Sequence, residues 1–124
     1  MAGKGASRRP EQVAEAIRTV LAEALVQGEL RDPRVGMVTV SSVEVTRDLS
    51  VATVRVVPHG EDDASRDAAL EGLRSAAGFL RRLVAQSLTT RTVPELRFVR
   101  DQGLEHARRI DELLAGLGND EDAP

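Results

Sequence analysis

The segment Leu73-Arg74-Ser75-Ala76-Ala77-Gly78-Phe79-Leu80-Arg81-Arg82 lies in the middle of a long stretch with helical periodicity. Apolar residues recur in this stretch at steps of three and four, which predicts a helix with one side facing a core. These residues are Leu70, Leu73, Ala77, Leu80, Val84 and Leu88. We expect one helix that ends near Leu88. The spacing alone does not show whether this helix bends at Gly78.

Three arginines surround Gly78 in the sequence. Arg74 precedes it by four residues, and Arg81 and Arg82 follow it by three and four. On a continuous helix these offsets place three guanidinium groups on one side, around the glycine. Glycine inside a helix costs about 1 kcal/mol relative to alanine, but its missing side chain lets a backbone or a ribose approach closely. A seat for a phosphodiester chain and a solvated arginine face with an incidental glycine both fit these residues.

The composition restricts the class of protein. A chain of 124 residues without cysteine fits one domain in a reducing cytoplasm, and it has no disulfide, thiolate zinc site or cysteine nucleophile. No apolar run approaches the length of a membrane span. Phe79 and Phe98 are the only aromatic residues, so the chain has too few rings to stack bases on a sheet. We therefore expect a soluble cytoplasmic protein without a base-stacking platform.

Charge is unevenly distributed along the chain. The formal net charge is −3, which by itself argues against a nucleic-acid partner. However, residues 74–100 contain six arginines and one acid, Glu95, and residues 1–10 contain only basic charges. Because the electrostatic field follows local arrangement, a basic face can exist on an acidic protein.

No motif predicts catalysis. His59 and His106 lie outside any hydrolase-like pattern, and phosphate-binding or dinucleotide-binding glycine motifs are absent from the sequence. The pair Asp111-Glu112 fits a helix surface better than a metal site, since nothing nearby in the sequence offers further ligands. We expect no enzyme activity, no cofactor and no metal.

The remaining segments predict an α+β domain with the order α-β-β-α-β-α. A first helix starts near Ser7 or Pro10 and stops near Gly28. Strands over 37–46 and 49–57 form a hairpin, and a bulge at Ser41-Ser42 puts four valines on one face. Asp63 or Ser65 caps the central helix, and a strand over 95–99 runs parallel to the second strand.

The last predicted helix follows Asp101, which is its expected cap, and stops at Gly118. We expect the helices to pack on the apolar face of the sheet. The predicted boundaries are a disordered tail over 1–7, one domain over 8–117 and an acidic disordered tail over 118–124.

Six motifs in series resemble the ribosome-binding factor A family over residues 9–115. They are Asp32-Pro33-Arg34-Val35-Gly36, Val38-Thr39-Val40, Val43-Glu44-Val45-Thr46-Arg47-Asp48-Leu49-Ser50, Ala76-Ala77-Gly78-Phe79-Leu80-Arg81, Arg91-Thr92-Val93-Pro94-Glu95-Leu96-Arg97-Phe98 and Arg109-Ile110-Asp111-Glu112-Leu113-Leu114. The sequence departs from the family pattern at Gln12, where a basic residue is frequent, and at Gly103, where a serine is frequent. These departures put part of the first-helix contact and the last helix cap in question.

The resemblance implies a type II KH-like fold with a three-stranded mixed sheet. In that family a helix-kink-helix with an A-x-G signature, here Ala76-Ala77-Gly78, replaces the G-x-x-G loop. The resemblance also implies a non-catalytic assembly factor. Such a factor binds the free small (30S) ribosomal subunit and its 16S rRNA and assists late maturation, including 5′-end processing and cold adaptation.

We expect RNA contacts from the arginines around the signature and from the signature itself: Arg74, Ala76, Ala77, Gly78, Arg81 and Arg82. Second-rank candidates are Arg8, Arg9, Arg47 and Arg91. The expected protein is a monomer without a membrane or small-molecule partner. Two alternatives stay open: a protein-interaction or oligomerisation module that uses the first or last helix, and KH-like RNA binding unrelated to the ribosome.

Overall fold

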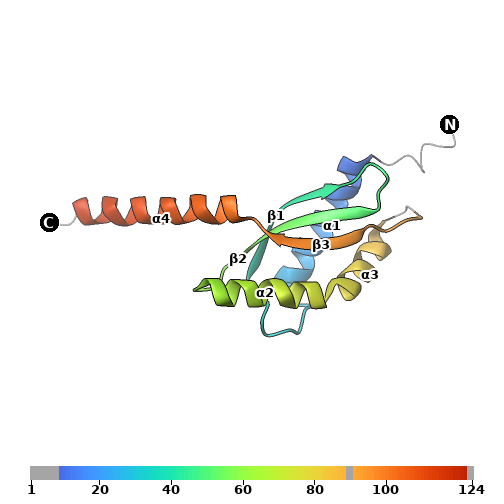
Figure 1. The fold of residues 1–124 in the computed structure, drawn as a ribbon, viewed down its shortest axis with the longest axis horizontal. Coiled ribbons are helices and arrows are strands. Elements are labelled where there is room, and N and C mark those ends of the chain that lie inside the picture. Colours follow the sequence, from blue (N-terminus) through green and yellow to red (C-terminus); the bar gives the residue numbers. More distant parts are fainter. Residues whose placement is uncertain (1–8, 89–90, 123–124) are drawn as a thin grey trace.

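The computed structural model describes residues 9–88 and 91–122, with side chains up to residue 117. The elements are α1 (Pro10–Val26), β1 (Val38–Val45), β2 (Val51–Pro58), α2 (Asp63–Ser75), α3 (Ala77–Ser87), β3 (Glu95–Arg100) and α4 (Gln102–Asp122) (Figure 1). This order confirms the predicted α+β class and its type II KH-like arrangement. The predicted tail over 1–7 and residues 123–124 lie outside the described residues.

The sheet has the strand order β1-β2-β3. Strands β1 and β2 pair antiparallel, and their register shifts between Val40 and Ser42. Both the hairpin and the predicted bulge are therefore confirmed. Strand β3 pairs parallel to β2, as a crossover through a helix requires, and it forms one edge of the sheet.

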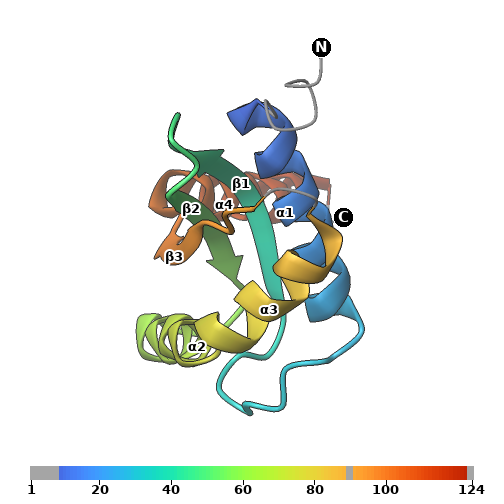
Figure 2. The same cartoon turned by 90° about the vertical axis from the view of Figure 1, so that its right-hand side faces the viewer.

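Helices α1, α2 and α3 cover one face of this sheet (Figure 2). Helix α1 contributes a completely buried stripe that includes Val13 and Ile17, and β2 contributes Val54 and Val56 from the same face of the sheet. Burying apolar area of this kind is the main favourable term in folding. Because the apolar side of α1 is buried in the core, it cannot serve as the binding surface of an interaction module.

The central helix is broken at Ala76. This residue has φ −92° and ψ 4° and separates α2 from α3. The spacing alone leaves a bend open, and the break agrees with the helix-kink-helix that the family resemblance implies; it lies at Ala76, two residues before Gly78. Apolar residues continue at steps of three and four on both sides of the break, with Leu73 and Leu80 both buried, which is why periodicity did not reveal it.

The ends of two helices differ from expectation. Asp62, not Asp63 or Ser65, caps α2 by accepting a hydrogen bond from the Ser65 N–H at 2.8 Å. Asp101 caps α4 as predicted, accepting from the Leu104 N–H at 3.0 Å. Helix α4 continues past Gly118 to Asp122, so the predicted stop is wrong; a glycine weakens a helix by about 1 kcal/mol without necessarily ending it.

Helix α4 also fails to pack on the sheet. It extends away from the rest of the molecule (Figure 1), and Leu113, Leu114 and Leu117 are exposed. The apolar face of the sheet is already covered by the other three helices, so it leaves no room for a fourth. Within the described ranges, no helix is both long and apolar enough to cross a lipid bilayer.

Gly72 provides a test of how the kinked helix is supported. A Cβ atom at this position would lie 2.8 Å from Val35 Cγ2 and 3.3 Å from Asp32 Oδ2, in the loop before β1. Val35 is buried, so the loop must shift to accommodate an added methyl group. We expect Gly72→Ala to lower the free energy of unfolding by about 1–2 kcal/mol, because overpacking outweighs the gain in helix propensity.

Urea denaturation measures this change. Gly78→Ala is the matched control, since nothing lies within 4 Å of a Cβ at that position, and it should be as stable as the wild type or more stable by up to about 1 kcal/mol. Equal stability of Gly72→Ala and wild type would contradict close packing of the loop on α2.

Candidate nucleic-acid interface

A groove of about 510 Å³ lies between the α2–α3 junction and the edge strand β3. The helical side is formed by Arg74, Ala77, Gly78 and Arg81. The strand side is formed by Glu95, Leu96, Arg97, Phe98 and Val99. The structure thus brings Ala77 and Gly78 of the predicted A-x-G signature and two of its arginines into one concave surface, whereas Ala76 does not line it.

Gly78 lies on the open side of this groove. It is exposed, and no heavy atom lies within 4 Å of the position that a Cβ would occupy. The N-cap of α3, Ala76, makes no side-chain capping bond. The first turn of α3 therefore presents bare backbone, and a helix N-terminus carries partial positive charge that favours anions.

Arg74 and Arg81 bind the backbone of the opposite wall. Arg74 donates from Nε and Nη2 to the Phe98 carbonyl oxygen at 3.2 and 3.1 Å. Arg81 donates from Nε to the Pro94 carbonyl oxygen at 3.2 Å and from Nη2 to that of Val93 at 2.6 Å. These bonds give partners to one carbonyl of the edge strand and to two carbonyls of the residues just before it. Because a carbonyl has no net charge, they hold each guanidinium in place without neutralising it.

Arg82 does not share this position. It is exposed on α3 and does not line the groove. The groove therefore takes two of the three predicted guanidinium groups, and the role of Arg82 stays a prediction. Gly78 and Arg82 lie four residues apart on the same helix, α3, whereas Arg74 lies on α2, before the break at Ala76.

The second-rank arginines come from segments at the end of the sheet opposite α4 (Figure 1). Arg9 precedes α1, Arg47 lies in the β1–β2 turn, and Arg91 lies in the connection to β3. The turn and the start of β3 are adjacent, since the Glu95 N–H donates to the Ser50 carbonyl oxygen at 2.9 Å. Arg8 lies outside the described residues.

The turn that presents Arg47 is fixed by its own hydrogen bonds. The Ser50 and Thr46 hydroxyls donate to Asp48 Oδ1 at 2.7 and 2.8 Å. The Ser50 hydroxyl, followed by that of Thr46, lowers the pKa of Asp48. Leu49 has a φ of 61°, a conformation that a leucine keeps only when its surroundings determine it. Arg47 is therefore held on a defined turn.

Most of the predicted arginines are not paired with acids. Within 9–88 and 91–117, where side chains are described, five of them have no ion pair with a carboxylate: Arg9, Arg47, Arg81, Arg82 and Arg91. Arg74 has one, with Glu71 at 3.3 Å, between two half-exposed side chains, and such pairs contribute little. The candidate site therefore keeps most of its positive charge.

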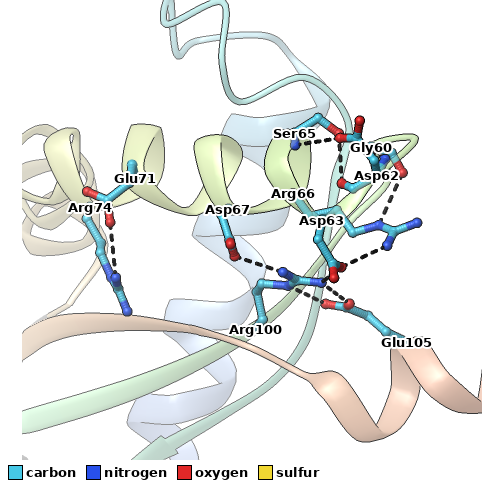
Figure 3. Close-up of polar contacts among 10 residues, drawn as sticks. All are labelled: Gly60, Asp62, Asp63, Ser65, Arg66, Asp67, Glu71, Arg74, Arg100 and Glu105. Atoms are coloured by element: carbon cyan, nitrogen blue, oxygen red, sulfur yellow. Dashed lines mark hydrogen bonds and ion pairs between the residues drawn. The ribbon is translucent and has the colours of Figure 1, made fainter.

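By contrast, Arg100 is enclosed by acids (Figure 3). The Arg100 side chain is 10% exposed, and its guanidinium contacts Asp67 at 2.8 Å, Asp63 at 3.2 Å and Glu105 at 2.5 Å. The hydrogen bonds that Arg100 donates to Glu105 are the main cause that raises the pKa of Arg100, and the bond that Arg100 donates to Asp63 lowers the pKa of Asp63. This cluster joins β3 to α2 and α4, so the arginine at residue 100 is structural although it belongs to the basic stretch 74–100.

The loop before β1 contacts the end of α2, next to the helical side of the groove. Arg34 Nη2 donates to Asp32 Oδ2 at 2.6 Å and to the hydroxyl of Ser75, the last residue of α2, at 3.4 Å. The Arg34 side chain lowers the pKa of Asp32 to about 2. The ion pair therefore stays charged over the physiological range and holds the loop against the end of α2.

Sequence reasoning missed the strand side of the groove. Arg97 lines it, with its Nε 3.2 Å from Glu95 Oε2. The carbonyl bonds of Arg74 and Arg81 were also missed, because they join residues distant in sequence. Only the predicted parallel third strand could have indicated this side of the groove, since it places residues 95–99 at a sheet edge.

No metal site accompanies the groove. Across the described part of the chain, no group of histidines and carboxylates is arranged to hold a metal ion.

The fold agrees with the comparisons to known proteins. The family model of ribosome-binding factor A matches residues 9–114. The chain is 48% identical to ribosome-binding factor A of Thermomicrobium roseum over 87% of this chain and 82% of the relative. It is 41% identical to that of Geobacter metallireducens over 92% of this chain and 95% of the relative. The chain therefore belongs to the ribosome-binding factor A family.

Solved structures give the same result. The crystal structure of ribosome-binding factor A from Thermus thermophilus matches with a TM-score of 0.61 and 27% identity, over 75% of this chain and 97% of that one. A Thermus thermophilus homology model fitted into the cryo-EM map of a complex with the 30S subunit matches with a TM-score of 0.57 and 30% identity. This second match covers 69% of this chain and 88% of the relative.

The bonds to the edge strand can be tested by removing the guanidinium groups. We expect Arg74→Met and Arg81→Met each to lower the free energy of unfolding by about 1 kcal/mol, because each leaves strand-edge carbonyls without a donor. Arg82→Met is the matched control and should change it by less than about 0.5 kcal/mol. Chemical denaturation of the three variants checks this, and an Arg81→Met protein no less stable than Arg82→Met would contradict the structural role.

Proposed function

We propose that this protein is a non-catalytic assembly factor that binds the free small ribosomal subunit and contacts its 16S rRNA through the groove beside Gly78. The observation that carries this proposal is the groove itself. Bare backbone at Gly78 is flanked by Arg74 and Arg81, whose guanidinium groups are fixed by neutral carbonyls and remain charged. Phosphate oxygens are the ligands that such an arrangement favours.

The aromatic residues support recognition by shape and phosphate contact. Phe98 is buried, and Phe79 packs against the core as a half-buried side chain. Neither ring is available as a free platform for base stacking. A contact made by arginines and backbone reads the course of an RNA chain more than its sequence.

Family membership supports the ribosomal partner. The relative from Thermus thermophilus is described in a complex with the 30S subunit, and we extend this partner to the present chain. We further propose that it assists late maturation of the small subunit, including 5′-end processing of 16S rRNA, and that it acts in cold adaptation. It does so as a cytoplasmic monomer without a cofactor or a small-molecule substrate.

Gly78→Glu tests the groove. The added carboxylate faces open space, and an acid in the first turn of a helix is favourable, so the fold should persist with an unchanged unfolding midpoint. The negative charge should repel phosphate and lower the affinity for purified small subunits at least tenfold, about 1.4 kcal/mol. Co-sedimentation with isolated small subunits measures this loss.

Ala22→Glu is the matched control, because Ala22 is an exposed alanine of α1 and the charge change is identical. It should bind as the wild type does. Unaltered co-sedimentation of Gly78→Glu would overturn the proposed role of the groove. Equal binding of the wild type to large and small subunits would contradict the ribosomal assignment.

A further inference from the structure

The distal half of α4 presents an apolar stripe that no described part of the chain covers. Ile110, Leu113, Leu114 and Leu117 follow the spacing i, i+3, i+4, i+7, so they share one side of the helix. Their exposed fractions are 42%, 64%, 60% and 58%. Contiguous apolar surface on a protein with an otherwise complete core marks an interaction site.

Contacts at its base fix the direction in which α4 projects. Asp101, which caps the helix, accepts a hydrogen bond from the Ser41 hydroxyl at 2.8 Å. Glu105 is bound to Arg100, and Arg108 Nη1 lies 3.3 Å from His59 Nε2. These contacts end at residue 108, and the helix then leaves the body of the molecule (Figure 1). The contacts at the base of α4 therefore fix the position from which the apolar stripe projects.

Charge determines what kind of partner fits. Asp111 and Glu112 flank the stripe, and the sequence over 110–122 contains three further acids and no lysine or arginine. Phosphate groups of RNA would be repelled by this segment. An anionic bilayer would be repelled as well, since helices that lie on membranes carry lysine and arginine beside their apolar face. A protein segment with aliphatic and basic side chains is complementary in both respects.

A second copy of this chain fits less well. Two copies of α4 packed along 110–117 would bring Asp111 and Glu112 of both helices to the same short seam. Like charges placed together in an interface disfavour association. A partner that supplies positive charge removes this penalty.

We propose that the distal half of α4 is a docking surface for a basic, aliphatic segment of a small-subunit protein. This inference rests on the proposed function and adds a second contact of a different chemical class. The groove at Gly78 receives RNA, and the acidic, apolar end of α4 receives protein.

Affinity measurements with purified small subunits test the stripe. Leu114→Ser should weaken binding about tenfold, because a central apolar contact is lost. Its matched control is Val26→Ser, which replaces an exposed apolar residue of α1, 86% accessible, and should leave the affinity unchanged. Glu112→Lys should weaken binding about threefold, and its control Glu23→Lys should not. All four positions are exposed, so unfolding midpoints should stay within about a degree of the wild type.

Photo-cross-linking identifies the class of the partner. A benzophenone amino acid replaces Leu114 in one full-length variant and Gly78 in another, and each is irradiated on purified small subunits. We expect the product from position 114 to be a protein adduct that resists ribonuclease, and the product from position 78 to contain RNA. A cross-link from position 114 to RNA, or to a second copy of this chain, would overturn the inference.

The outcomes separate this inference from the proposed function. If Gly78→Glu loses binding but Leu114→Ser binds as the wild type does, the docking surface is refuted and the groove stands. If Leu114→Ser loses binding but Gly78→Glu does not, the docking surface is supported and the groove is refuted. If the wild-type protein does not bind small subunits, both are overturned.

Discussion

The hydrogen bonds from Arg74 and Arg81 to the backbone of the edge strand control the rest of the candidate site. They connect α2 to β3 at Phe98 and α3 to Val93 and Pro94, just before β3, on the two sides of the groove beside Gly78. The same bonds made to carboxylates would fix the side chains but cancel their charge. Neutral acceptors combine a fixed guanidinium position with a retained positive charge, which is what a binding site for phosphate requires.

Structural arginines and candidate binding arginines have different electrostatic surroundings. Arg100, with Asp63, Asp67 and Glu105 around it, shows the opposite arrangement to the groove: its charge is compensated and it holds three elements together. Among the described side chains, Arg81 at the groove and Arg9, Arg47 and Arg91 at the far end of the sheet have no carboxylate partner. Acids instead accumulate along α4. A net charge of −3 therefore conceals a basic surface and an acidic, apolar one that suit different partners.

Local patterns predicted most of the fold. The bulge at Ser41-Ser42 was predictable because the alternation of valines shifts by one residue there. The parallel third strand was predictable because a strand-helix-strand connection is nearly always a right-handed crossover. The break at Ala76 was not predictable from apolar spacing, which continues across it; only the resemblance to a family implied a kink there. The projection of α4 depends on how much of the sheet the other helices already cover.

Long-range contacts account for the part of the site that the sequence did not show. Nothing in the spacing of Arg81 and Val93 indicates that a guanidinium meets a carbonyl there, because carbonyls occur at every residue. The signature Ala76-Ala77-Gly78 was informative because it resembles a family pattern, whereas its physical role depends on Gly78 facing open space. Site chemistry was thus predictable from residue types, and site geometry was not.

The salt dependence of binding to purified small subunits tests the central claim most directly. If about five arginines contact phosphates, a plot of log affinity against log salt should fall with a slope of magnitude about 3–4. Arg81→Met should reduce this magnitude by about 0.7, since one phosphate contact is lost. A slope near zero, or an Arg81→Met slope equal to that of the wild type, would contradict the account.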